Sequence, residues 1–206
     1  MKLIGRKNSS NVQKVLWCCA ELGIEYEHQD AGREFGVVDT DEFFKINPNR
    51  RVPVLIDEDF ILWESNAIVR MLSAKYGMGT LFPKDIQAQA NAGRWMDWQL
   101  ATLGPGFTAM FHGLVRDDHE NRKWDAINKS IAVTQANLQI LDQYLADQEF
   151  VAGDRLTMGD IPVGIYVYRW YSFDGVNRKS LPNLERWYTA LRERPAFREF
   201  VMVGLG

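Results

Sequence analysis

Two residue pairs near the middle of the chain carry groups suited to bind a small peptide-like ligand. Glu64 and Ser65 place a carboxylate and a hydroxyl where a helix is predicted to begin. A helix N-terminus offers free N–H groups and the positive end of its dipole to a carboxylate. Pro53 begins a predicted strand, and if its bond to Val52 were cis, the Val52 backbone would be presented outward. Taken separately, Val52-Pro53 can be explained by a proline at the start of a strand, and Glu64-Ser65 by an ordinary helix cap. The spacing of the two pairs across one hairpin favours a peptide-like ligand.

The segment 47–76 predicts the elements that hold these residues. A turn signal at 47–49 precedes two apolar runs, 54–56 and 60–63, which flank a polar turn in the pattern of a β-hairpin. Ser65 is a favourable N-cap, so the helix is expected to begin there. Its apolar positions recur at helical spacing and are Ile68, Leu72 and Tyr76.

Val52-Pro53, the hairpin and the run Glu64-Ser65-Asn66-Ala67-Ile68 together resemble the glutathione site of the glutathione S-transferase family. The resemblance implies that the Val52 backbone, before a cis Pro53, pairs with the cysteinyl part of glutathione. It also implies that Glu64 and Ser65 hold the γ-glutamyl end. Arg51 lies where the family often has a residue that meets the glycyl end, although a solvated loop charge is an equal alternative.

The loop before the first predicted helix carries the candidates for activating a thiol. Free glutathione has a thiol pKa of roughly 8.5, and the thiolate is the nucleophile, so a catalyst must stabilise it. The segment 8–15 resembles the family's serine-type motif, which puts Ser9 on the thiolate-binding hydroxyl and Asn11 on an auxiliary asparagine. Ser9, Ser10 and Asn11 can all reach toward a helix terminus, and all three can serve merely as caps.

Composition limits the classes of function. The 206 residues allow one or two domains, and a net charge of −3 shows no nucleic-acid footprint. No signal-peptide core and no run of transmembrane length is present, so no membrane partner is expected. Adjacent Cys18 and Cys19 would point in different directions on a helix, which predicts no disulfide and a cytoplasmic location. The histidines His28, His112 and His119 show no metal spacing.

Patterns around the hairpin complete the first domain. A strand at 2–5, a helix from Val12 to a Gly23 C-cap and a weak strand at 25–30 form a βαβ unit. A short helix capped by Asp39 or Thr40 follows it. The resulting order, βαβ-α-ββ-α, predicts a thioredoxin-like α/β domain over residues 1–77.

A second, all-α domain is predicted over residues 86–206. Glycines and a proline within 77–83 mark the break, and the linker is placed at 78–85. One helix is expected over 86–103 and should kink or end at Gly104-Pro105-Gly106. Thr157 and Asp160 form a capping box in which Asp stands for Glu. The resemblance makes that box a structural marker of the family's helical domain.

The resemblance further implies an acceptor pocket between the domains, with Phe107, Phe111 and Trp170 as its candidate wall. An apolar wall suits a poorly soluble electrophile, and ordinary core packing is the alternative for each residue. The predicted function is therefore that of a cytoplasmic, homodimeric glutathione transferase that joins glutathione to a small, mostly apolar electrophile. A glutathione-dependent isomerase or dehalogenase, or a non-catalytic ligand-binding or interaction protein on the same fold, are the alternatives.

Overall fold

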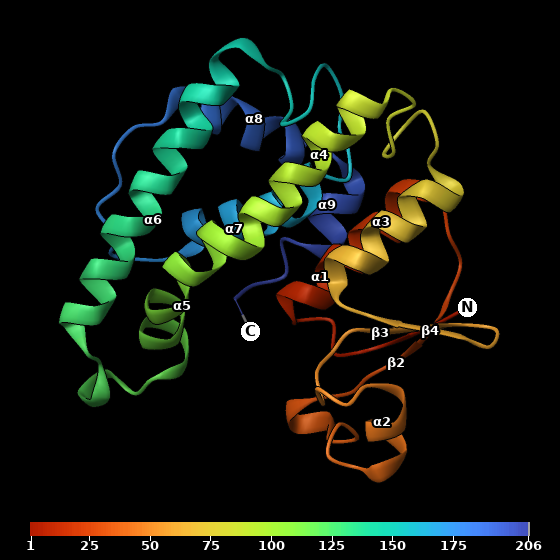
Figure 1. Cartoon of the computed structure of the whole chain (residues 1–206). Helices are drawn as coiled ribbons and strands as arrows, with labels where there is room; N and C mark the ends of the chain where they lie inside the picture. Colours follow the sequence, from red (N-terminus) through yellow and green to blue (C-terminus); the bar gives the residue numbers. More distant parts are fainter. Residues whose placement is uncertain (206) are drawn as a thin grey trace.

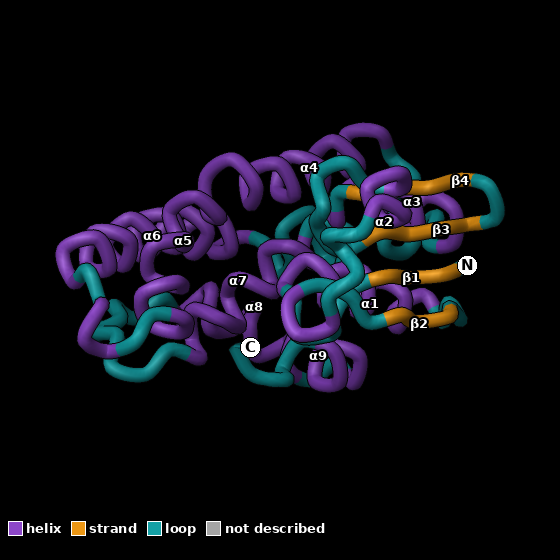
Figure 2. Tube along the Cα trace, turned by 90° about the horizontal axis from the view of Figure 1, so that it is seen from below, coloured by secondary structure: helices purple, strands orange, loops and turns teal. Residues whose placement is uncertain are grey.

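Four short strands form one mixed sheet in a computed structural model that describes residues 1–205. The strand order is β2-β1-β3-β4, with β1 parallel to β2 and antiparallel to β3, and with β3 and β4 joined as a hairpin (Figure 2). Leu3 lies opposite both Leu55 and His28 in the register. The strands are β1 (Lys2–Ile4), β2 (Glu27–Gln29), β3 (Val54–Asp57) and β4 (Phe60–Trp63).

Three helices cover the sheet, with α1 and α3 on one face and α2 on the other (Figure 1). Gly23 ends α1 in the left-handed conformation, with a φ of 64°, as the sequence predicts. Thr40 caps α2, because its hydroxyl oxygen accepts a hydrogen bond from the Phe43 N–H. The helices are α1 (Ser10–Leu22), α2 (Asp41–Ile46) and α3 (Ser65–Tyr76), and the predicted thioredoxin-like order is confirmed.

A continuous apolar core joins the sheet domain to the helices that follow it. Leu3, Leu55 and Leu72 are fully buried, and so is Trp17, whose ring packs against Phe197 near the C-terminus. Cys18 and Cys19 are buried free thiols, and the sequence predicts no disulfide between them. Burial raises the pKa of both thiols, that of Cys19 to about 12, which keeps them protonated and unreactive.

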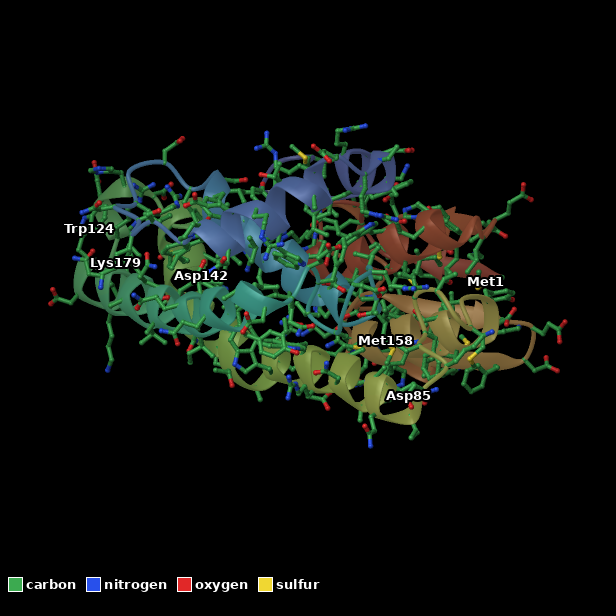
Figure 3. All side chains as sticks on the ribbon, turned by 90° about the horizontal axis from the view of Figure 1, so that it is seen from above. Met1, Asp85, Trp124, Asp142, Met158 and Lys179 are labelled. Carbon is green, nitrogen blue, oxygen red and sulfur yellow. The ribbon has the colours of Figure 1, made fainter. Side chains whose placement is uncertain are left out.

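The rest of the described chain is helical and forms the other end of the molecule. Figure 3 labels Met1 at the sheet end and Trp124 and Lys179 at the opposite end. None of the helices within residues 1–205 combines the length and apolar character needed to cross a bilayer. The helices are α4 (Ile86–Trp98), α5 (Gly104–Phe111), α6 (Trp124–Tyr144), α7 (Asp160–Ser172), α8 (Pro182–Arg192) and α9 (Pro195–Phe200).

The glycine–proline segment does not end the helix that precedes it. A π-helical turn, Gln99–Leu103, leads directly from α4 into α5, and Leu103 and Gly104 keep helical backbone angles. A proline ring clashes with the carbonyl four residues earlier in a regular α-helix. The extra residue of the π-helical turn changes this spacing just before Pro105, so the chain passes the proline while remaining helical.

Asp160 anchors the start of α7 and joins it to neighbouring segments. The Thr157 N–H donates to its carboxylate at 2.8 Å, which is one half of the predicted capping box. The other half differs, because the Thr157 hydroxyl accepts from the Gly159 N–H at 3.3 Å and Gly159, not Thr157, occupies the N-cap position of α7. The carboxylate also accepts from the Thr157 hydroxyl, the Val151 N–H and the Trp187 indole. Burial raises the pKa of Asp160 to about 6 against the opposing effect of these donors, so the group is ionised at pH 7.

Candidate functional site

A cleft of about 560 Å³ lies between the sheet domain and the helical domain. This volume lies within the usual range for small-molecule sites. The cleft brings together residues from the start of α1, the loop before β3, the start of α3 and the helix α5. Ten of the eleven sequence-predicted site residues line it. They are Ser9, Ser10, Asn11, Arg51, Val52, Pro53, Glu64, Ser65, Phe107 and Phe111.

The serine loop places a free hydroxyl at the N-terminus of α1. Ser9 occupies the N-cap position, yet its side chain makes no capping hydrogen bond, and the residue lines the cleft. Ser10 begins the helix, and the Asn11 side-chain oxygen accepts a hydrogen bond from the Ser65 hydroxyl at 3.3 Å. Ser9 therefore has its hydroxyl available to donate to a ligand, beside the unpaired N–H groups of the first helical turn.

The loop before β3 presents unpaired backbone to the same cleft. The Val52–Pro53 peptide bond is cis. Within residues 1–205, the Val52 N–H and carbonyl form no hydrogen bond with another residue. Asn47 shapes the loop from behind, because its amide donates to the Arg51 carbonyl at 2.8 Å. An extended peptide carries the carbonyl and N–H groups that can pair with the free N–H and carbonyl of Val52.

The start of α3 differs from the predicted capping arrangement. Ser65 is the first helical residue and Glu64 occupies the N-cap position, with a φ of 72° and a ψ of 107°. The predicted N-cap role of Ser65 is therefore wrong, because its hydroxyl donates to Asn11 instead of receiving a helix N–H. The first N–H groups of α3 remain free at the cleft, and strained backbone such as that of Glu64 is typical of ligand sites.

Comparisons with known proteins agree with this geometry. The family model described as the glutathione S-transferase N-terminal domain matches residues 1–73, and the C-terminal domain model matches residues 102–195. Glutathione S-transferase GstB of Escherichia coli is 43% identical over 203 residues, covering 98% of this chain and 97% of that protein. The chain belongs to the glutathione S-transferase family.

Solved structures of this family superpose on the whole chain. A theta class glutathione S-transferase from Xanthomonas axonopodis pv. citri with glutathione bound has a TM-score of 0.95 and 40% identity, and covers 100% of this chain and 98% of its own. Poplar glutathione transferase F1 has a TM-score of 0.85 and 26% identity, and covers 98% of this chain and 96% of its own. The thioredoxin-like sheet domain followed by a helical domain is therefore the family's fold.

The predicted role of Trp170 does not agree with its position in this transferase fold. Its side chain is 1% exposed and does not line the cleft. The α7 residues that do reach the cleft are Tyr166 and Arg169, whereas Trp170 lies one helical turn beyond Tyr166 on nearly the same face and packs in the core. Phe107 and Phe111 line the cleft as predicted, and Tyr166 packs edge-on against Phe107 with 5.1 Å between ring centroids.

The cleft is lined by more arginines than the sequence predicts, since only Arg51 was a predicted site residue. Six arginines line it against one carboxylate, Glu64, which leaves a formal charge of +5 in a chain whose net charge is −3. Arg50 has a φ of 51°, a conformation that residues other than glycine rarely adopt, and its guanidinium lies 3.8 Å from the Asp41 carboxylate. The other five are Arg6, Arg33, Arg51, Arg116 and Arg169.

A buried lysine lies directly behind the start of α3. Lys14 is fully buried, and its Nζ donates to the Gln99 side-chain oxygen at 2.8 Å and to the Ser65 hydroxyl at 3.4 Å. This chain of contacts runs from the helical domain through α1 to Ser65 and on to Asn11. The sequence shows Lys14 as a charged residue within a largely apolar helix, but it does not show that Lys14 contacts the helical domain.

Removing the Lys14 amine should change how stability depends on pH. Burial lowers the pKa of Lys14 from 10.5 to about 7, with Glu64 opposing and Arg169 reinforcing the shift. Between these values the unfolded chain binds more protons than the folded chain, so the free energy of unfolding rises with pH. Denaturant unfolding of wild type and Lys14→Met from pH 7 to 10 should show wild type gaining a few kcal/mol relative to the variant, since one pKa unit is about 1.4 kcal/mol.

Lys129→Met is the matched control, because Lys129 is exposed on α6. It should unfold with the same pH dependence as wild type. A difference between wild type and Lys14→Met that stays constant from pH 7 to 10 would show that the buried amine remains protonated throughout.

Proposed function

We propose that this chain is an enzyme that binds glutathione, stabilises its thiolate through the Ser9 hydroxyl and transfers it to a small electrophile. The observation that carries the proposal is the Ser9 hydroxyl, which makes no capping bond and faces the cleft at the N-terminus of α1. A hydroxyl that donates to a sulfur anion beside a helix N-terminus favours the thiolate over the thiol.

Three neighbouring groups support a defined orientation of glutathione. The γ-glutamyl carboxylate would bind the free N–H groups at the start of α3 beside Ser65, and the γ-glutamyl ammonium would bind the Glu64 carboxylate. The cysteinyl backbone would pair with the unpaired groups of Val52, next to Pro53. The glycyl carboxylate would then lie toward the Arg51 guanidinium. This orientation directs the cysteinyl sulfur to Ser9.

The reaction needs a thiolate and an acceptor held within reach of it. The thiol proton leaves to solvent as the thiolate forms, and the sulfur then bonds to the electrophilic carbon while the leaving group departs with its electron pair. Phe107 and Phe111 form the wall of the cleft that faces this position from the helical domain. Ser10 and Asn11 are neighbours of the reacting sulfur in this arrangement, and Asn11 is already bonded to Ser65.

Glutathione binding should depend on the Glu64 carboxylate. Glu64→Gln removes the charge that pairs with the γ-glutamyl ammonium, and we expect the dissociation constant of glutathione to rise by about tenfold or more. Isothermal titration calorimetry measures this directly. Glu58→Gln makes the same charge change at an exposed turn of the hairpin and should bind glutathione as wild type does. Equal binding by all three proteins would refute the proposed orientation.

Product analysis separates transfer from the alternative reactions. With 1-chloro-2,4-dinitrobenzene as acceptor, a transferase consumes one glutathione for each dinitrophenyl conjugate that mass spectrometry detects. A glutathione-dependent isomerase returns free glutathione at the end of its cycle. A binding protein on this fold would bind glutathione without accelerating either reaction.

We also infer that the chain forms a homodimer and acts in the cytoplasm, as the family resemblance implies. Apolar side chains exposed on the edge strand β4 and at the start of α4 support a self-association surface, among them Phe60, Trp63 and Ile86. Sedimentation equilibrium should give twice the chain mass. Phe60→Lys should shift the mass toward that of the monomer.

A further inference from the structure

The cleft wall facing the thiolate position is cationic as well as aromatic. Arg6 and Arg33 reach it from the sheet domain, whereas Arg116 and Arg169 reach it from the helical domain. The guanidinium carbons of Arg116 and Arg169 lie 5.0 Å and 4.7 Å from the ring centroid of Phe111. Two positive charges thus accompany the aromatic ring that the sequence analysis assigned to an apolar acceptor.

These guanidinium groups retain hydrogen-bonding capacity that the protein does not use. Arg169 is 5% exposed, and its Nε has no hydrogen-bond partner within residues 1–205, although its Nη2 donates to the Asn8 carbonyl. The buried Nε of Arg6 is likewise without a partner in this part of the chain. Buried polar groups of folded proteins are nearly always paired, so unpaired guanidinium N–H groups in two residues that line the cleft support a role of these arginines toward a ligand with acceptor atoms.

The charges of this group are not balanced by neighbouring carboxylates. No ion pair within residues 1–205 includes Arg6, Arg33, Arg116 or Arg169. Burial and mutual repulsion lower the pKa of Arg6, Arg116 and Arg169, and Glu34 is the only carboxylate that opposes this for Arg6. Bringing like charges together in a partly buried cleft is unfavourable unless an anion binds between them.

Glutathione alone does not account for this charge. Its ammonium and one carboxylate are matched by Glu64 and the start of α3, and its glycyl carboxylate by Arg51 on the opposite loop. Within the proposed function, on which this inference rests, we propose that the acceptor carries an anionic group, a carboxylate above all. That carboxylate binds Arg116 and Arg169 beside Phe111, with Arg33 and Arg6 across the cleft.

A haloacetate illustrates the reaction that such a site would favour. The glutathione sulfur attacks the methylene carbon of iodoacetate, the carbon–sulfur bond forms as the carbon–iodine bond breaks, and iodide leaves with the bonding electrons. The product is S-carboxymethylglutathione. Iodoacetamide undergoes the same displacement with nearly the same shape and no charge, so the two compounds isolate the effect of the carboxylate.

Binding of the two products tests the proposal without requiring turnover. We expect calorimetry to give wild type a dissociation constant about tenfold lower for S-carboxymethylglutathione than for S-carbamidomethylglutathione, because charge-assisted arginine–carboxylate bonds are strong. Arg116→Gln and Arg33→Gln change exposed residues that should not affect folding. Each should reduce the preference severalfold. Arg198→Gln removes the same charge from the exposed surface of α9 and should leave the preference unchanged.

Turnover gives the second comparison. The ratio of kcat/KM to the uncatalysed rate should be higher for iodoacetate than for iodoacetamide in wild type, and Arg116→Gln should remove that advantage. Equal binding of the two conjugates by wild type would overturn the anionic acceptor and leave the glutathione site intact. An arginine variant that weakens the binding of both conjugates equally would show that the arginines bind glutathione itself. That result would also overturn the proposal of an anionic acceptor. Failure of both conjugates to bind would instead refute the proposed function.

Discussion

Ser9→Ala should lower kcat/KM for glutathione conjugation about 10- to 100-fold while changing the dissociation constant of glutathione by less than about threefold. The hydroxyl donates to a charged sulfur, a hydrogen bond worth about 1.5–3 kcal/mol, and each 1.4 kcal/mol corresponds to about tenfold in rate. Binding depends on other groups, namely the Val52 backbone, Glu64 and the start of α3. Steady-state kinetics with 1-chloro-2,4-dinitrobenzene, together with calorimetry, separate these two effects.

Ser10→Ala is the matched variant, because Ser10 also lines the cleft and is the next residue in the loop. It should retain activity within a few-fold of wild type. If Ser10→Ala lost the activity and Ser9→Ala kept it, the thiolate donor would be Ser10. If both variants kept wild-type activity, no serine of this loop would stabilise the thiolate.

Asp160→Ala should reduce the free energy of unfolding by about 4 kcal/mol. The carboxylate accepts four hydrogen bonds from Val151, Thr157 and Trp187, and its removal leaves buried donors unpaired. At 2–4 °C for each kcal/mol in a protein of this size, the melting temperature should fall by roughly 8–16 °C. Differential scanning calorimetry measures both quantities.

Asp160→Asn and Thr157→Val resolve the cause of this loss. Asparagine keeps the volume of Asp160 but turns an amide toward N–H donors, so it should destabilise the protein by several kcal/mol. Thr157→Val removes only the hydroxyl contacts and should cost about 1 kcal/mol. An Asp160→Asn variant as stable as wild type would mean that packing, and not hydrogen bonding, holds the start of α7.

The elements that the sequence predicts correctly depend on contacts between near neighbours. The end of α1 at Gly23, the hairpin of β3 and β4, and the hydrogen bond from the Thr157 N–H to Asp160 each rest on residues a few positions apart. Local preference and tertiary structure agree at these positions, so a single sequence suffices to predict them. The cleft residues at the starts of α1 and α3 were instead proposed from the resemblance to the transferase family, and the structure brings them together in one cleft.

The side of α7 that faces the cleft was not predictable in this way. Nearly every residue from Asp160 to Trp170 is buried, so the sequence shows no polar face from which to read the orientation of the helix. Trp170 is the largest apolar residue of this run, but it lies one turn beyond Tyr166 along the helix and is buried in the core. Tyr166 and Arg169 reach the cleft because of how α7 packs against α1 and α4, which only the folded chain reveals.

The charged residues around the cleft were missed because most charged side chains are solvated. Arg6 and Arg169 come from distant segments, and nothing in either local sequence indicates that they meet. Lys14 carried the clearer signal, since the apolar run from Val15 to Cys19 follows it directly, but a long lysine can also reach solvent from such a position. Lys14 is buried at the contact with the helical domain, where the Gln99 side-chain oxygen accepts a hydrogen bond from its Nζ.

The thiol pKa of bound glutathione tests the central proposal most directly. Ultraviolet absorbance of the thiolate, titrated in the complex with wild-type protein, should give a pKa one to two units below the free value of roughly 8.5. Ser9→Ala should return the pKa to the free value while glutathione stays bound. A wild-type complex that titrates at the free value would contradict thiolate stabilisation and would leave a glutathione-binding protein on a transferase fold.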